Sequence, residues 1–367
     1  MISLFRGLAS SSKMAVIAYN YASTNPNVHR RHPVPNEGTF REISFMPVNL
    51  LNQIRCSCKA VTAMSSYIQI NTGQIPNYAE SIPIHEAISP EHDPKTHYLN
   101  HGEDTAAFFL ILDTINFGSG YFPHLAKQPG MSGYFTVASS LNDYFKQHGP
   151  MSAEQLKRLT VAECTTIFKQ KPHNHPIQEL MQLFATALNT LGNYLIDRFN
   201  ASFTSLIAAA ENSAERLAAL LIKMPFFNDV QTYDGLKIHF YKRAQLTAAD
   251  LSLALDGEGL GFFKDLSGLT IFADNLVPHV LRMDGILEYD TDLAARIDNE
   301  HLIPSGSKEE IEIRACAVHA VELIAAELHK KGLKATSQGL DYLLWNRGQQ
   351  PCYKKTKPRH RTRTVYY

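Results

Sequence analysis

The sequence lacks any long hydrophobic run, since no apolar stretch approaches the roughly 18 residues needed to cross a bilayer. It also lacks net charge, because 35 lysine and arginine residues balance 35 aspartate and glutamate residues. No global basic field therefore indicates a nucleic-acid surface. The five cysteines are odd in number and too few for a disulfide framework in a chain of 367 residues. They favour reduced thiols, and we expect a cytoplasmic protein.

Several signatures of metal and catalytic sites are also missing. There is no H-E-x-x-H, no G-x-S-x-G and no Cys-His signature. The glycines Gly257, Gly259 and Gly261 lack the Lys-Ser/Thr ending of a phosphate loop and instead predict a tight turn. Cys56 and Cys58 are two positions apart, with no second pair nearby to complete a zinc site. We therefore predict no metal site and no cofactor.

Composition changes along the chain. The first forty residues are rich in Asn, Ser, Pro and His, which predicts a poorly ordered leader over residues 1–45. We expect residues 46–367 to form a single helical domain, with helices in 46–100 packing onto its core. The run that starts at Tyr353 carries six basic residues and no acid. Such a run either folds back onto the core, stays solvated or binds RNA.

The spacing of apolar residues predicts a mainly α fold with at most one small hairpin, near 230–240. The nearly all-apolar run at 105–117 fits a buried helix or a buried strand, and periodicity does not separate them. Pro225 is expected to end the second of two long helices. The predicted helices are 176–196, 203–224, 241–254, 276–287, 309–330 and a short buried one at 340–345.

Three aspartates lie inside apolar runs: Asp113, Asp274 and Asp341. Burying a carboxylate is unfavourable unless it is paired or hydrogen-bonded, and strongly perturbed acids often mark functional sites. The structural alternative is that each accepts backbone N–H bonds or caps a helix, which suits Asp274 because a helix follows it. Lys242 and Arg243 lie between aromatic residues and a helical stripe. They are either solvated helix-face charges or partners of a phosphate or a buried acid.

Six segments of the chain together form a recognisable pattern: LDTINF (112–117), SGY (132–134), FYKRAQLTAADL (240–251), GFFKDLSGLTIFADNLVPHVL (261–281), EIEIRACAVHAVELI (310–324) and LDYLLW (340–345). Taken in order, these segments resemble those of the queuosine salvage proteins, the queuosine 5′-phosphate N-glycosylase/hydrolase family. The resemblance extends over roughly residues 100–367, and the ending RHRTRTVYY is similar too. This chain departs from the family pattern at 118–120, where Gly-Ser-Gly stands in place of an aromatic residue.

The resemblance implies a helical fold similar to DNA glycosylases but without their DNA-binding elements. It also implies a hydrolase that acts on the N-glycosyl bond of queuosine 5′-monophosphate and releases the base queuine for tRNA modification. Asp274 would be the carboxylate at the anomeric carbon, Asp341 a base ligand and Lys242 a phosphate or carboxylate partner. The candidate substrate-binding residues are Asp113, Asn116, Phe117, Tyr134, Phe227, Arg243, Asn275 and Trp345.

Two other functions fit the same residues. One is a non-catalytic protein that binds the modified base or nucleotide, since binding and catalysis use the same acids. The other is a glycosidase that acts on a related deazapurine nucleoside or on RNA, which the basic ending favours. From the resemblance we expect a small-molecule nucleotide as the partner, with no membrane partner and no direct tRNA binding.

Overall fold

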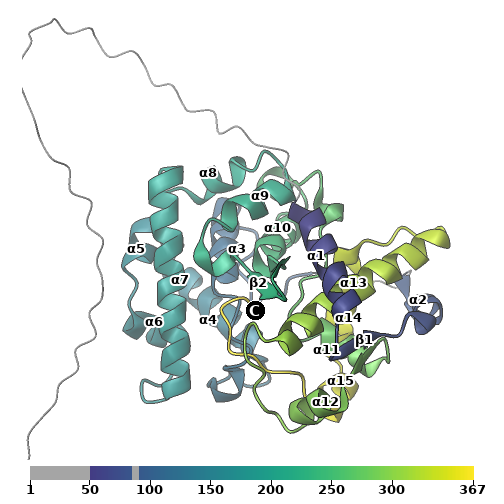
Figure 1. The fold of residues 1–367 in the computed structure, drawn as a ribbon. Coiled ribbons are helices and arrows are strands. Elements are labelled where there is room, and N and C mark those ends of the chain that lie inside the picture. The colour runs from purple at the N-terminus through teal and green to yellow at the C-terminus, as the bar shows by residue number, and fades with distance from the viewer. Residues whose placement is uncertain (1–49, 85–90) are drawn as a thin grey trace, which may run out of the picture. The chain divides into compact units, whose positions relative to one another are not determined.

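The computed structural model describes residues 50–84 and 91–367, so the predicted leader at 1–45 lies outside the described residues. Helices dominate the described chain, as the sequence predicts, and the strands form two small sheets (Figure 1). The α-helices are α1 (Leu50–Met64), α2 (Ile75–Ser81), α3 (Glu103–Thr114), α4 (Gly133–His148), α5 (Ala153–Arg158), α6 (Val161–Ile167), α7 (His175–Phe199), α8 (Phe203–Ala208), α9 (Ala214–Leu221), α10 (Lys242–Ala254), α11 (Val277–Met283), α12 (Thr291–Asp298), α13 (Lys308–Lys330), α14 (Ser337–Gly348) and α15 (Pro351–Thr356). The strands are β1 (Ile68–Ile70), β2 (Val230–Tyr233), β3 (Leu236–His239) and β4 (Leu287–Tyr289).

The apolar run at 105–117 forms the helix α3, which decides between the two expected structures. Every residue from Thr105 to Thr114 is buried, so the helix carries no solvent-facing stripe whose period the sequence could display. Glu103 and Asp104 lie in the first turn, where negative charge is stabilised by the helix dipole. α10 packs against both α3 and α9.

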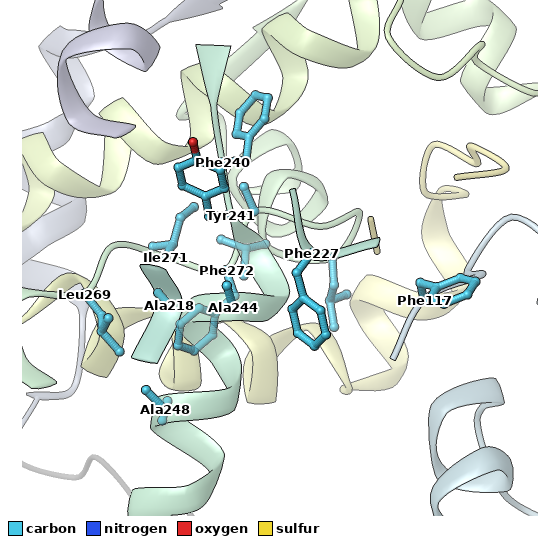
Figure 2. Packing of buried hydrophobic residues seen from close by; sticks show 14 of the residues in the cluster. Phe117, Ala218, Phe227, Phe240, Tyr241, Ala244, Ala248, Leu269, Ile271 and Phe272 are labelled. Atoms are coloured by element: carbon cyan, nitrogen blue, oxygen red, sulfur yellow. The ribbon is translucent and has the colours of Figure 1, made fainter. Parts of the chain in front are cut away.

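Two further groups of helices complete the core. The long helix α7 packs against α5 and α6, and α1 and α2 both pack against α13. In α13 the predicted apolar stripe is buried, including Ile311, Val318 and Leu328. Figure 2 shows Phe227 and Phe240 among buried side chains around Ala244 of α10. Within the described residues no helix is both long and apolar enough to span a membrane.

The predicted hairpin is confirmed by the antiparallel pair β2–β3, in which Val230 lies opposite His239 and Tyr233 opposite Leu236. Asp234 and Gly235 form its two-residue turn, and both have positive φ, as a tight hairpin turn requires. A second sheet pairs β1 with β4, which lie far apart in the sequence. Its three-residue strands are too short to show an alternating pattern, so no sequence signal predicts it.

Most predicted helices differ from the structure only at their ends, but one is broken in two and another is much shorter than expected. The expected helix at 203–224 is wrong as a single element, because the chain breaks between α8 and α9. Glu211 and Asn212 have positive φ there, and Ser213 then caps α9 by accepting a hydrogen bond from the Arg216 N–H. The expected helix at 276–287 ends early, at Met283, because Gly285 at φ 74° turns the chain into β4.

Candidate active site

A cavity of about 690 Å³ lies between one face of α10, the segment 272–276, the helix α14 and the C-terminal tail, which we define as residues 354–367. Its size is typical of sites for small molecules. Eight of the eleven predicted site residues line it, although they come from segments far apart in the sequence. These eight are Asn116, Phe117, Tyr134, Lys242, Asp274, Asn275, Asp341 and Trp345.

The segment that carries Asp274 is held from two sides. Asp341 of α14 accepts a hydrogen bond at Oδ1 from the Phe272 N–H, at 2.9 Å. The buried guanidinium of Arg314 donates from Nε to the Ala273 carbonyl oxygen, also at 2.9 Å. Because these bonds fix the two residues before it, Asp274 enters the cavity from a rigid backbone.

Asp274 itself performs the structural role that the sequence offered as an alternative. Its Oδ1 accepts hydrogen bonds from the backbone N–H groups of Leu276 at 2.7 Å and Val277 at 3.4 Å, at the start of α11. Both bonds go to the same oxygen. Among the described residues no donor bonds Oδ2, so one carboxylate oxygen orients the side chain and the other remains available in the cavity.

Asp341 and Lys242 lie close enough to Asp274 for their charges to interact. Burial raises the pKa of Asp341 to about 8, and the charge of Asp274 adds to this shift, against smaller opposing effects of the Phe272 N–H and Lys242. Burial lowers the pKa of Lys242, while Asp274, Asp113 and Asp341 oppose the shift. At neutral pH Asp341 is therefore mainly protonated.

Asp250, which the sequence analysis missed, also lines the cavity, about two turns further along the same face of α10 as Lys242. Asp113 is fully buried behind this lining, where Asn116 donates to its Oδ1 at 3.4 Å. Burial raises the pKa of Asp113 to about 6. Burial and then the charge of Asp113 raise the pKa of Asp250 well above its usual value. The two acids therefore titrate as a pair, and burial favours one shared proton over two negative charges.

Two histidines extend this group. The His92 Nε2 lies 3.8 Å from the Asp250 Oδ1, and the ring centroids of His92 and His97 are 4.7 Å apart. His97 Nε2 is 3.0 Å from the Tyr134 hydroxyl oxygen. Burial lowers the pKa of His92 to about 3 and that of His97 to about 4. His92 is therefore neutral at pH 7, and its contact with Asp250 is not an ion pair.

An aromatic wall closes one side of the cavity. The Trp345 ring stands edge-on to Tyr134 and Phe135, with centroid distances of 6.5 and 6.1 Å. All three residues line the cavity. Edge-to-face packing fixes the rings and leaves their faces available to a planar ligand.

Arg243 and Phe227, two of the predicted substrate-binding residues, do not line the cavity. Arg243 is buried and donates hydrogen bonds to the carbonyl oxygens of Asp113, Thr114, Phe226 and Val365. Its guanidinium carbon lies 4.7 Å from the Phe227 ring centroid. Lys242 and Arg243 are adjacent in an α-helix and so point about 100° apart, one to the cavity and one to the core.

The C-terminal tail forms part of the cavity wall. Arg359, Arg361 and Tyr367 line it, whereas His360 and Thr362 are buried on the other side of the tail. This alternation is typical of an extended segment with one face on the core. The tail folds back onto the core, as one of the alternatives from the sequence held, and Lys357, Arg361 and Arg363 lie within ion-pair distance of acidic residues.

The amino-acid sequence contains few signals that could have identified the cavity residues that the sequence analysis missed. Lys242, Leu246 and Asp250 are spaced by four and line one helix face, so helical periodicity from Lys242 was the available signal for Asp250. No similar signal marks His92, His97 or Arg359. Within residues 50–84 and 91–367, no group of three or more His, Cys, Asp or Glu side chains is arranged to hold a metal ion.

The fold and the cavity define a helical protein with acid–base groups arranged around a site for a small polar ligand. Residues 96–367 match the family described as queuosine salvage protein, and the chain belongs to this family.

Three relatives are each named queuosine 5′-phosphate N-glycosylase/hydrolase. The protein of Sphaerobacter thermophilus is 34% identical over 315 residues, which cover 84% of this chain and 96% of the relative. The protein of Dictyostelium discoideum is 31% identical and covers 87% of this chain and 100% of the relative. That of Bos taurus is 32% identical, with 85% and 98% covered.

Proposed function

We propose that this chain hydrolyses the N-glycosidic bond of queuosine 5′-phosphate and releases the base queuine for reuse in tRNA modification. One observation carries the proposal: Asp274, Asp341 and Lys242, which come from three separate segments, line one cavity. The relatives that are similar over most of this chain are named for the same reaction. Free thiols at all five cysteines support a reducing compartment, and we place the reaction in the cytoplasm.

In this proposal Asp274 acts at the anomeric carbon. Cleavage of a nucleoside bond develops positive charge on the sugar, and a fixed carboxylate nearby stabilises that charge. The Oδ1 of Asp274 is held by the start of α11, which leaves Oδ2 to face the sugar. Because the backbone on both sides of Asp274 is also fixed, the oxygen is already in position before the substrate binds.

The departing base needs a proton donor, because a 7-deazapurine lacks the N7 that protonates when ordinary purines leave. Asp341 suits this step, since its pKa of about 8 keeps it protonated at neutral pH. The aminomethyl group of queuine is cationic and requires a negative partner. The pair of Asp113 and Asp250, which carries one negative charge, provides that partner at the cavity wall.

The aromatic wall supports recognition of the planar base. Tyr134, Phe135 and Trp345 contribute rigid rings, and stacking on such faces is favourable for any heteroaromatic base. Asn116 and Asn275 line the cavity and have amide groups that suit the polar edges of the base and sugar.

The Asp274→Asn variant tests the proposal. Purified protein is incubated with queuosine 5′-phosphate, and the free base is measured by mass spectrometry. We expect wild-type protein to release queuine, and the variant to be slower by about 100-fold or more while still binding the base. Asp197→Asn, at an exposed position on α7, is the matched control and should keep full activity.

If wild-type protein binds the nucleotide but releases no base, the proposed hydrolysis is wrong and the chain is a non-catalytic binding protein. The RNA alternative predicts cleavage of intact tRNA that weakens steeply with salt. Arg361 pairs with Glu300 at 2.6 Å and Arg363 with Glu179 at 3.7 Å, so much of the tail's charge is already neutralised. This pairing favours the free nucleotide over tRNA.

A further inference from the structure

The tail holds Arg359 at a defined place beside the cavity. The Ile303 N–H donates to the Arg361 carbonyl oxygen at 2.8 Å, and Asn275 donates to the His360 carbonyl oxygen at 3.4 Å. Both bonds fix the backbone immediately after Arg359. The Arg359 side chain therefore lines the cavity from a backbone whose following residues are hydrogen-bonded to the rest of the protein.

Arg359 differs from the other basic residues of the tail in its partners. Lys357 and Arg361 lie within ion-pair distance of Asp298 and Glu300 respectively. No carboxylate or carbonyl group of the described residues forms an ion pair or hydrogen bond with the Arg359 guanidinium. The charge of Asp274 acts on Arg359 without a direct ion pair.

The local field at Arg359 is that of a cation cluster. Burial lowers the pKa of Arg359, and Arg361 adds to this effect while Asp274 opposes it. Burial and the charge of Arg359 likewise lower the pKa of Lys354. Like charges that repel one another beside a cavity are stabilised by an anion that enters it.

The position of Arg359 relative to Asp274 fits one part of the proposed substrate. A 5′-phosphate lies one ribose ring away from the anomeric carbon, so a phosphate partner is required near Asp274 but not against it. Lys242 lies among Asp274, Asp113 and Asp341, where a phosphate would be repelled. Both terminal nitrogens of Arg243 already donate to carbonyl oxygens of the core.

We infer that Arg359, assisted by Lys354, binds the 5′-phosphate and makes the site select a nucleotide over the free nucleoside. A guanidinium presents paired N–H donors that match phosphate oxygens. This role replaces the expectation that Lys242 or Arg243 binds the phosphate. It rests on the proposed function for the identity of the substrate.

The test compares Arg359→Gln with wild-type protein on queuosine 5′-phosphate and on queuosine. We expect kcat/KM for the nucleotide to fall about 10- to 100-fold more than kcat/KM for the nucleoside, as loss of a charged hydrogen bond predicts. Arg359→Lys keeps the charge but loses the paired donors, so its loss should be intermediate. Arg363→Gln, a tail arginine outside the cavity lining, should leave the ratio between the two substrates unchanged.

A second measurement separates this inference from the proposed reaction. Ribose 5-phosphate should raise the melting temperature of wild-type protein more than ribose does, and Arg359→Gln should abolish the difference. If wild-type protein cleaves neither substrate, the proposed function fails, and the ribose 5-phosphate result still decides the role of Arg359. Equal losses for nucleotide and nucleoside in Arg359→Gln, or equal stabilisation of wild type and variant by ribose 5-phosphate, overturn the inference.

Discussion

The guanidinium of Arg314 lies 2.9 Å from the carbonyl oxygen of Ala273, the residue immediately before Asp274. Arg314 has no solvent-exposed side-chain surface and also contacts both Asp229 oxygens and Glu310. One buried cation thus joins α13 to the segment that carries the proposed catalytic acid. The placement of Asp274 depends on a charged group that never touches the cavity.

The Arg314→Met variant should be much less stable than the wild-type protein. The substitution leaves Asp229 and Glu310 buried without their partner, which typically lowers the free energy of unfolding by about 3–5 kcal/mol. Urea unfolding followed by circular dichroism measures the change. Arg198→Met, at an exposed position on α7, should change stability by less than about 0.5 kcal/mol. Equal stability of the two variants would contradict the structural role of Arg314.

Asp341→Asn should stabilise the protein at alkaline pH. The pKa of Asp341 is about 8 when folded, against about 4 in an unfolded chain. The folded state therefore binds this proton more tightly, and the Asp341 contribution to stability falls as pH rises from about 4 to about 8. The variant removes this loss, by on the order of 1–3 kcal/mol. Melting curves at pH 5 and pH 9 test the sign, and a larger gain at pH 5 would refute it.

The same carboxyl group should shape the pH dependence of the reaction. If neutral Asp341 donates the proton, wild-type kcat/KM for queuosine 5′-phosphate falls as pH rises through about 8. Asp341→Asn should lower kcat about 100-fold and lack that alkaline decline. A variant that is slower but keeps the wild-type profile would assign the titration to another group.

Trp345 should report ligand binding directly. It is the only tryptophan in the chain and lines the cavity beside Tyr134 and Phe135. Queuine that stacks on this wall should therefore quench or shift the intrinsic fluorescence in a saturable way. Trp345→Phe should remove the signal while isothermal titration calorimetry still detects binding. Saturable binding with unchanged Trp345 emission would place the base elsewhere.

Gly120→Ala should displace the C-terminal tail. A Cβ at Gly120 would lie 2.4 Å from the Thr362 carbonyl oxygen, which is backbone and has no flexible end to move away. We expect a loss of about 1–3 kcal/mol in the free energy of unfolding and reduced hydrolysis of the nucleotide. Gly73→Ala is the control, since its nearest neighbour is the Asn71 Oδ1 at 3.7 Å. If both variants behave like wild type, the tail does not pack on Gly120 as described.

The sequence predicts the helical class because most helices here have one apolar face. The sequence does not decide whether the α3 segment is a helix or a strand, since a helix that is buried on all sides shows no periodic alternation of apolar and polar residues. It also joins α8 and α9 into one helix, because the apolar spacing continues across the break. Ser213 and the distant Asp265 stabilise that break, and the Asp265 carboxylate accepts hydrogen bonds from the Ser213 hydroxyl and the Ala214 N–H at 2.6 Å each.

The sequence predicts some residues of the site and misses others, and the difference again depends on whether the local sequence shows burial. Acids inside apolar runs are conspicuous, and Asp274 and Asp341 both line the cavity. Asp250 lies among small and polar residues of α10, so its burial depends on what packs around that helix. Arg359 lies in a run of positive charge that resembles a solvated tail. Only the three-dimensional path of the tail separates it from Arg361 and Arg363, which have acidic partners.

The path of the tail also has a consequence for protein synthesis. The Gly118 N–H donates to the Tyr367 carbonyl oxygen at 2.9 Å, and Arg243 donates to that of Val365 at 2.7 Å. These tail residues leave the ribosome after every other part of the cavity wall has emerged. A nascent chain can therefore form the central helices early, yet it acquires a complete cavity only once residues 354–367 have also emerged and docked.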